Sequence, residues 1–498
     1  MTESFYLIWR NQYIRKLIRN RVCQNLVINV NENYLIRNHQ YLSLFTNRDK
    51  LDYNIGIRFE GRDDDYLDIN SNNRDLINVV DFKKDTGNFN LDIILDCVQK
   101  LSFSTNSNTM RATGKLPPSI TWLQLMKDDF YCIKPLAQQI LSNLPDNLQW
   151  LELGSHLQYN FTSPCIMPQS LTDIKSSSYF YYQNLKWFVV PPNKVYKSCV
   201  LYIDSMESFE WLLENKWICN VEIDPNVLIM LMGQYQLPSH VTKVNVNVGI
   251  VRDISFLPQT LESLEGIYGA SFSHLTQLKV LKIYDISVEK LEKGVLPPLL
   301  QELLIIYNYP LEIDVLPPHL TALCLPIYDC PLYTNVFPAS LTSINLGSFK
   351  QPFHPFVLPN KLKSLSMQKF TQPTFPPNSL PLSLSDLALD RFKGSFDQCQ
   401  PLDNLQSLKI CSLVPSLATL LTNVKKLDIE VAGDNDDDLS GTCLANTSIK
   451  SLYLKFVFQR TLYPNTFPPT VRYLTLINAD LKSDDVIPSG CVLKNEYR

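Results

Sequence analysis

Few side chains in this 498-residue sequence stand at spacings that support chemistry. The acidic run at residues 434–438 comes closest, because its alternating aspartates are spaced like the first ligands of a calcium-binding loop. Such a loop also needs a glycine at its sharp turn and a bidentate glutamate at its end, whereas this sequence places Leu439 and Ala445 there. We therefore expect a solvated insertion loop here, and another at residues 63–65.

The other reactive residue types are scattered. The 6 histidines are isolated from one another, and the 12 cysteines include no Cys-x-x-Cys pair. Neither a glycine-rich phosphate loop nor a Gly-x-Ser-x-Gly turn is present, and the sequence holds only 15 Gly beside 32 Pro. We expect no catalytic residue, no metal site and no cofactor, and we expect the cysteines to be reduced.

Composition limits the class of protein further. The sequence is 45% hydrophobic and has 45 Lys+Arg against 49 Asp+Glu, a net charge of −4 that argues against a nucleic-acid partner. No apolar run reaches the ~18 residues of a membrane span, and residues 1–30 lack the apolar stretch of a secretory signal. We expect a cytoplasmic protein without membrane insertion, and the length alone would allow roughly three domains.

An internal repeat must supply the elements that position any site. Its pattern is Leu or Phe, then Pro, two variable residues, an apolar residue, two variable residues, and two apolar residues separated by one position. Between residues 237 and 476 the pattern recurs about every 21 residues, the period of the leucine-rich-repeat class. The clearest copies lie at 316–325, 337–346, 358–367, 380–389 and 467–476. Weaker copies extend back to about residue 73, with candidates at 198–203 and 218–223.

The spacing within one copy predicts a short strand. Leu323 and Leu325 alternate, so both point to one side, Leu320 packs beside them from the preceding turn, and the proline sets the corner. Stacked copies bury a continuous core and form a parallel sheet. We therefore predict a β-rich solenoid, a leucine-rich-repeat-like curved parallel sheet with short irregular or 3-10 convex connections, few positive-φ corners and an N-terminal helical cap.

Four connections share an aromatic residue followed by two variable residues and Pro, and we expect the aromatic to fill the outer core. Together with the Leu-Pro that follows at 358–359, this pattern resembles the FNIP repeat, a relative of the leucine-rich repeat. The resemblance implies a cytoplasmic repeat scaffold and supplies no catalytic residue. The sequence departs from the family at the second position, where Asn appears once. The four connections are 307–310, 328–331, 349–352 and 370–373, with second residues Asn308, Asp329, Lys350 and Thr371.

We expect three regions along the chain. Residues 1–47 form an N-terminal helical cap region, 48–236 hold degenerate leucine-rich-type repeats, and 237–498 hold regular repeats with a C-terminal cap. Within the first region, residues 4–21 place apolar residues at helical spacing between basic ones. This helix caps the solenoid in the simplest interpretation. The alternatives are an F-box-like, adaptor-binding helix and, with few supporting bases, a membrane-surface helix.

The residue between the paired apolar positions of each strand points outward, which predicts a ladder from Gln124 to Thr475 along the concave face. Its middle is small and uncharged while its flanks carry charge, a composition that suits a protein partner. Ordinary sheet-surface residues remain the alternative. The function we expect is a non-enzymatic protein–protein interaction scaffold, with an F-box-like substrate receptor of a cullin ubiquitin ligase as the second hypothesis. No small-molecule ligand is evident, and the partner protein is unidentified. The expected partner-binding residues are Lys282, Leu304, Cys324, Asn345, Ser366, Ala388 and Lys409.

Overall fold

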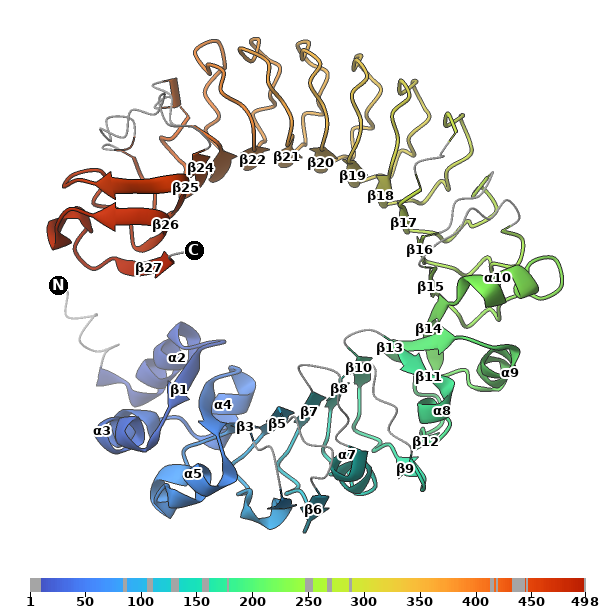
Figure 1. The fold of residues 1–498 in the computed structure, drawn as a ribbon, viewed down its shortest axis with the longest axis vertical. Coiled ribbons are helices and arrows are strands. Elements are labelled where there is room, and N and C mark those ends of the chain that lie inside the picture. Colours follow the sequence, from blue (N-terminus) through green and yellow to red (C-terminus); the bar gives the residue numbers. More distant parts are fainter. Residues whose placement is uncertain are drawn as a thin grey trace. The chain divides into compact units, whose positions relative to one another are not determined.

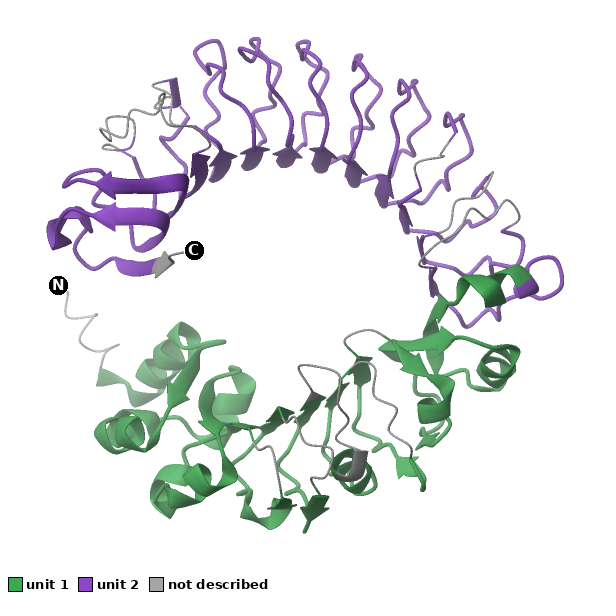
Figure 2. Cartoon of the chain, viewed as in Figure 1, with its two compact units in different colours: residues 1–229 green, residues 230–498 purple. Residues whose placement is uncertain are grey.

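The computed structural model divides the chain into two compact units, Met1–Ile229 and Met230–Arg498 (Figure 2). The division into three sequence regions stays a prediction. The acidic run at 434–438 lies outside the described residues. The structure describes residues 10–83, 87–104, 111–126, 134–154, 161–176, 179–246, 254–266, 271–285, 289–412, 416–417, 420–431, 444 and 447–496.

The second unit is a stack of parallel strands, each paired with the next along the chain. Its strands lie side by side along one edge of the curved stack, and the connections project from the other side (Figure 1). This arrangement is a β-rich solenoid of the leucine-rich-repeat type. The strands are β15 (Lys243–Asn245), β16 (Ser263–Glu265), β17 (Val280–Ile283), β18 (Glu302–Ile305), β19 (Ala322–Leu325), β20 (Ser343–Leu346), β21 (Ser364–Ser366), β22 (Asp386–Leu389), β23 (Ser407–Ile410), β24 (Lys426–Val431), β25 (Ser451–Leu462), β26 (Tyr473–Leu481) and β27 (Val492–Glu496).

The repeat pattern places its apolar residues in the core as predicted. Leu320, Leu323 and Leu325 are at most 2% exposed, and the equivalent residues of the neighbouring turns are buried with them. Between residues 232 and 496, the described connections contain turns, bends and the 3-10 helix η3 (Asp484–Val486), and no α-helix is found there. The predicted irregular or 3-10 connections are therefore confirmed for the described part of this unit.

A file of aromatic rings fills the outer core, which confirms the sequence prediction for the four connections. Tyr307, Tyr328, Phe349 and Phe370 are each at most 1% exposed. The ring of Phe349 stacks on both neighbours, with centroids 6.3 Å away and interplanar angles of 10° to Tyr328 and 5° to Phe370. The file continues to Phe392, 5.9 Å from Phe370. Repeated ring-on-ring contact thus ties each turn to the next.

Positive φ angles recur at one position in six turns of the second unit, so the prediction of few such corners was wrong. In each case the residue lies two positions before the apolar residue that precedes proline, as Asp314 does before Leu316. Asn and Asp adopt this left-handed conformation more readily than other side chains, because their short polar groups bond locally. Asn or Asp holds this position in four of the six turns, so glycine is not required there. The residues and angles are Gly294 (85°), Asp314 (64°), Asn335 (67°), Phe356 (60°), Asn378 (61°) and Asn465 (68°).

The first unit contains a seven-stranded parallel sheet and three smaller groups of paired strands. The weaker repeat copies predicted here are confirmed, because each supplies a strand with a buried apolar pair. The main sheet comprises β1 (Val27–Val30), β2 (Gly56–Gly61), β3 (Val79–Phe82), β5 (Lys100–Ser104), β7 (Trp122–Met126), β8 (Trp150–Leu153) and β10 (Asp173–Ser176). The others are β4 (Asn88–Asn90) with β6 (Arg111–Thr113), β9 (Cys165–Ile166) with β12 (Phe188–Val189), and β11 (Phe180–Tyr181) with β13 (Tyr196–Ile203) and β14 (Ile218–Ile223).

Helices in the first unit correct the prediction of irregular connections, because its longer connections fold locally. Residues 63–65 begin the helix α5 (Asp63–Asp68) and do not form a loop. Acids are favoured in a first helical turn, and the Asp65 carboxylate accepts the N–H of Arg62 at 3.3 Å. The helices are α2 (Gln12–Val22), α3 (Glu32–Leu42), α4 (Asn47–Asp52), α5 (Asp63–Asp68), α6 (Ser71–Arg74), η1 (Leu91–Ile93), α7 (Lys134–Leu141), α8 (Tyr182–Leu185), α9 (Met206–Glu214) and α10 (Pro225–Leu231).

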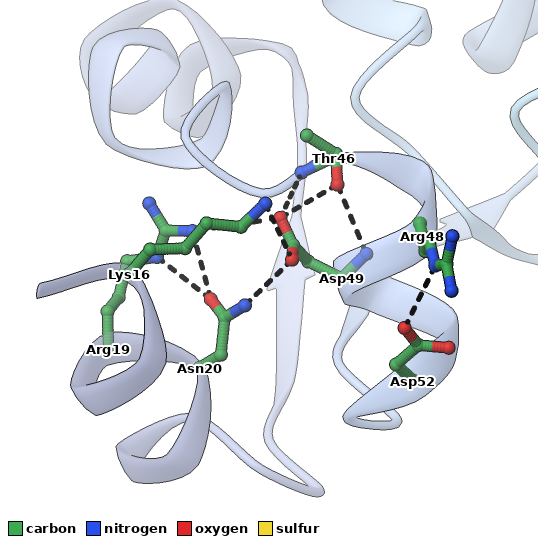
Figure 3. Close-up of polar contacts among 7 residues, drawn as sticks. All are labelled: Lys16, Arg19, Asn20, Thr46, Arg48, Asp49 and Asp52. Atoms are coloured by element: carbon green, nitrogen blue, oxygen red, sulfur yellow. Dashed lines mark hydrogen bonds and ion pairs between the residues drawn. The ribbon is translucent and has the colours of Figure 1, made fainter. Parts of the chain in front are cut away.

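The predicted N-terminal helix is confirmed over residues 12–21 as part of α2, while residues 1–9 lie outside the described residues. A buried carboxylate holds α2 to α4 (Figure 3). Asp49 accepts hydrogen bonds from Asn20 at 2.8 Å and from Thr46 at 2.7 Å, and pairs with Lys16 at 3.1 Å. Burial opposes the charge, but the hydrogen bonds outweigh it and lower the pKa of Asp49. These polar contacts therefore attach the helix to α4.

None of the helices within the described ranges combines the length and apolar character that crossing a bilayer requires.

Candidate interaction surface

The seven predicted partner-binding residues lie in one row across adjacent strands of the second unit. Backbone register pairs each of them with the next, from Lys282 opposite Leu304 on β17 and β18 to Ala388 opposite Lys409 on β22 and β23. We call this row the central ladder: Lys282, Leu304, Cys324, Asn345, Ser366, Ala388 and Lys409. Every member is half-buried. The alternation of buried and outward residues in each strand is what aligns them.

The charges at both ends of the central ladder are compensated within the unit. Lys282 Nζ lies 3.4 Å from Glu265 Oε2, and Tyr284 donates its hydroxyl to the same carboxylate at 3.0 Å. At the other end Lys409 Nζ pairs with Asp390 at 3.0 Å. Burial opposes the charge of Lys409, but the contact with Asp390 outweighs it and raises the pKa of the amine. The row is therefore bordered by ion pairs.

The middle of the central ladder is uncharged. Burial raises the pKa of the Cys324 thiol, so it remains protonated and is a poor nucleophile. Asn345, opposite Cys324 and Ser366 in the register, has a side-chain oxygen buried from solvent that accepts no hydrogen bond from the described residues. Leaving a buried acceptor unpaired costs about 1–3 kcal/mol.

The ladder predicted in the first unit is also in register, with Gln124 opposite Glu152 on β7 and β8. The sequence prediction began this ladder at Gln124. The same alternation of Val80 and Phe82 identifies Asp81 as the outward residue of β3, which the prediction did not include. Metal binding finds no support in the described part of the chain, where no group of three or more His, Cys, Asp or Glu side chains could hold an ion.

The second position of the aromatic connections has a visible structural role. The Asn308 side chain accepts the backbone N–H of Asp329 at 2.8 Å, and the Asp329 side chain accepts the N–H of Lys350 at the same distance. Asn and Asp both supply the acceptor, whereas the ammonium of Lys350 cannot. The departure from Asn at residue 329 therefore preserves this turn-to-turn bond, and the departure at residue 350 ends it.

One segment of the chain matches a known protein family, and it contains aromatic connections described above. Residues 328–370 match the family model described as FNIP Repeat. These residues contain the aromatic connections 328–331 and 349–352 and end at Phe370, so all three stacked rings lie within the match. A search of the curated proteins found no match.

Solved leucine-rich-repeat structures are similar to the chain over much of its length. CroV588, described as a novel circular LRR protein, is 17% identical over 85% of this chain and 73% of its own, with a TM-score of 0.41. The structure of the TLR13–ssRNA13 complex is 15% identical over 84% of this chain and 81% of its own, with a TM-score of 0.48. YopM from Yersinia enterocolitica is 16% identical over 84% of this chain and 87% of its own, with a TM-score of 0.30.

The strand order and register of the second unit agree with the match to the repeat. The parallel strands of the second unit repeat at the spacing of the sequence pattern, and the aromatic file runs through the matched residues. Residues 328–370 therefore resemble the FNIP repeat, and the second unit is folded as a solenoid of the leucine-rich-repeat type.

Proposed function

We propose that this chain is a non-enzymatic protein-interaction scaffold whose partner binds along the central ladder. One observation carries the proposal: seven half-buried side chains from seven neighbouring strands form a continuous row with an uncharged middle and ion-paired ends. Uncharged centres surrounded by polar rims are typical of protein interfaces. A repeat fold suits this role because it displays a long, regular surface.

The size of the row indicates what it accommodates. Parallel strands lie ~4.8 Å apart, so the six spacings from Lys282 to Lys409 span about 29 Å. An extended segment of about nine residues covers that distance. Asn345 lies midway along the row, and its side chain is half-buried. The proposed partner therefore presents an extended, largely uncharged segment.

Affinity capture with matched variants tests this proposal. We compare the wild type with the double variant Leu304→Arg and Ser366→Arg, which places two cations in the uncharged middle. The control is Ile313→Arg, a residue 58% exposed on a connection rather than on the ladder. Partners retained by the wild type and the control should be lost from the double variant, while circular dichroism stays unchanged. If the double variant retains the same partners, the binding surface lies elsewhere.

A second candidate function is that of an F-box-like substrate receptor, and exposed apolar residues on α2 favour it. Tyr13 is 69% exposed and Ile18 is 43% exposed. Large apolar groups left in water on one short helix suit an adaptor protein. In this hypothesis the central ladder binds the substrate and α2 binds the ligase adaptor.

Point substitutions test the receptor hypothesis better than truncation. Deleting residues 1–40 would remove β1, which pairs with β2, and would leave the edge of the sheet exposed. Tyr13→Ser with Ile18→Ser should abolish co-purification of cullin-adaptor components, whereas the central-ladder variant should retain them. Absence of those components from the wild-type preparation would contradict the hypothesis.

A further inference from the structure

A cavity of about 410 Å³ opens on the outward face of the main sheet in the first unit. Residues of β1, β2, β3, β5 and β7 line it, together with Asn54, which precedes β2. Its volume lies in the range of small-molecule sites. The central ladder belongs to the other unit, so this cavity is independent of the proposed protein-binding role.

The hollow exists because small residues form its floor. Gly56 on β2 has no side chain, and a Cβ there would lie 3.3 Å from Val79 Cγ2 and 3.4 Å from Val27 Cγ2. The two valines therefore close over the glycine and make the floor apolar. In the register Val79 lies opposite Lys100, and Lys100 lies opposite Trp122. Lys100 therefore lies between the valine floor and the indole of Trp122.

The charges around this cavity are unequally satisfied. Arg58 Nη2 lies 2.8 Å from Asp81 and 3.0 Å from Glu60, so its charge is compensated by two carboxylates. Lys100 Nζ instead donates to the amide oxygen of Asn54 at 2.5 Å, and no carboxylate of the described residues lies within ion-pair distance of it. The lining therefore presents one uncompensated ammonium group beside an apolar floor and an indole.

Desolvation acts on the same ammonium. Burial lowers the pKa of Lys100, which means that its charge is poorly solvated at this position. A bound anion would give this ammonium group a direct partner of opposite charge. A charge-assisted hydrogen bond of this kind is stronger than one between neutral groups. The position of Lys100 and its poor solvation thus both favour an anionic ligand.

We propose that this cavity binds a small carboxylic acid with a flat apolar body. The carboxylate pairs with Lys100 Nζ, and the body lies over Val79 and Val27, on the side of Lys100 that faces away from Trp122. Ser102 and Gln124 already share a hydrogen bond at 3.1 Å and limit the depth on the far side. The acid is either a free metabolite-sized molecule or the C-terminal carboxylate of an apolar residue.

Isothermal titration with 2-naphthoate and its neutral analogue 2-naphthalenemethanol tests this proposal on the full chain. The key variant is Lys100→Gln, which removes the charge from a half-buried side chain. The matched control is Lys175→Gln, because Lys175 lies outward on the same sheet but is already 3.9 Å from Glu152 and outside the cavity.

We expect 2-naphthoate to bind the wild type and Lys175→Gln equally and to bind Lys100→Gln at least about tenfold more weakly. The neutral alcohol should bind weakly and show no difference among the three proteins. A wild type that shows no heat of binding at millimolar 2-naphthoate, or equal affinity for Lys100→Gln, overturns the proposal.

Two further arms locate the site and the source of the acid. Val79→Phe fills the floor and should abolish binding in a variant whose circular dichroism is native, and retained binding there would place the ligand elsewhere. Acetyl-Gly-Gly-Phe with a free or an amidated terminus distinguishes the sources. Binding of the free acid alone identifies protein C-termini as ligands, and failure of both peptides beside bound 2-naphthoate identifies small acids.

Discussion

The side chain of Asn20 on α2 donates to the carboxylate of Asp49 on α4 at 2.8 Å, 29 residues away in the sequence. Asp49 is 6% exposed, so this contact is shielded from water. Polar bonds in such surroundings are costly to break, because the remaining partner stays buried and unsatisfied. The N-terminal helix consequently depends on one charged side chain.

We predict that Asp49→Asn destabilises the attachment of α2 by about 1–3 kcal/mol near neutral pH. The folded-state pKa of Asp49 lies below its unfolded value, so its contribution is present above the unfolded pKa and is lost as pH falls through the folded one. Chemical denaturation at pH values between 2 and 7 should therefore show that the free energy of unfolding falls less steeply with decreasing pH in the variant than in the wild type. Asp52→Asn is the control, because Asp52 pairs with Arg48 at the surface, and it should change stability by less than about 1 kcal/mol.

The aromatic file predicts a large effect from a single truncation. Phe349→Ala removes a fully buried ring that contacts Tyr328, Phe353 and Phe370. We expect a loss of about 3–5 kcal/mol, measured by chemical denaturation. Tyr333→Ala provides the comparison, because Tyr333 is 61% exposed and should matter little. Equal effects of the two substitutions would contradict the packing described for the file.

The strain at Phe356 predicts a stabilising substitution. Its φ of 60° is unfavourable for a bulky side chain, and its ring is 69% exposed and contributes little packing. Phe356→Asn should raise stability by about 1 kcal/mol, because Asn tolerates the left-handed conformation. The same change at Ile313, which precedes the left-handed Asp314, should be nearly neutral. A destabilised Phe356→Asn protein would show that the exposed ring has another role.

The hydrogen bonds that Asn308 and Asp329 accept from the next turn stop at Lys350. We predict that an acceptor placed at residue 350 extends this series by one bond. Lys350→Asn restores an acceptor at the position that follows Asn308 and Asp329, and we expect a gain of about 0.5–1.5 kcal/mol. Asp329→Ala should lose a similar amount. Lys361→Asn controls for the removed charge at an exposed turn. Thermal unfolding measures all three, and a loss of stability in Lys350→Asn would disprove this explanation of the departure from the family residue.

The sequence allowed the parallel stack and the central ladder to be predicted, because both follow from the apolar alternation within each turn. Leu323 and Leu325 place Cys324 outward wherever their strand lies in the sheet. The left-handed residues were missed because Asn and Asp also occur at many ordinary surface positions. The helices α7 and α9 were missed because the weak repeats of the first unit obscure the period.

The cavity beside Lys100 could not be predicted from its residue types. It depends on the side chain that Gly56 lacks and on a register that brings five strands together. The bond from Asn20 to Asp49 has the same origin, since no local pattern relates residues that far apart. Contacts that repeat with the period can be read from the sequence, whereas contacts that occur once cannot.

The bonds from Asn308 to Asp329 and from Asp329 to Lys350 each join one turn only to the next. The ring stack follows the same rule, with Phe349 placed between Tyr328 and Phe370. Energetics of this kind are those of a one-dimensional lattice. A gene segment encoding one whole turn can consequently be duplicated in frame, and the protein lengthens while every older turn keeps its own neighbours.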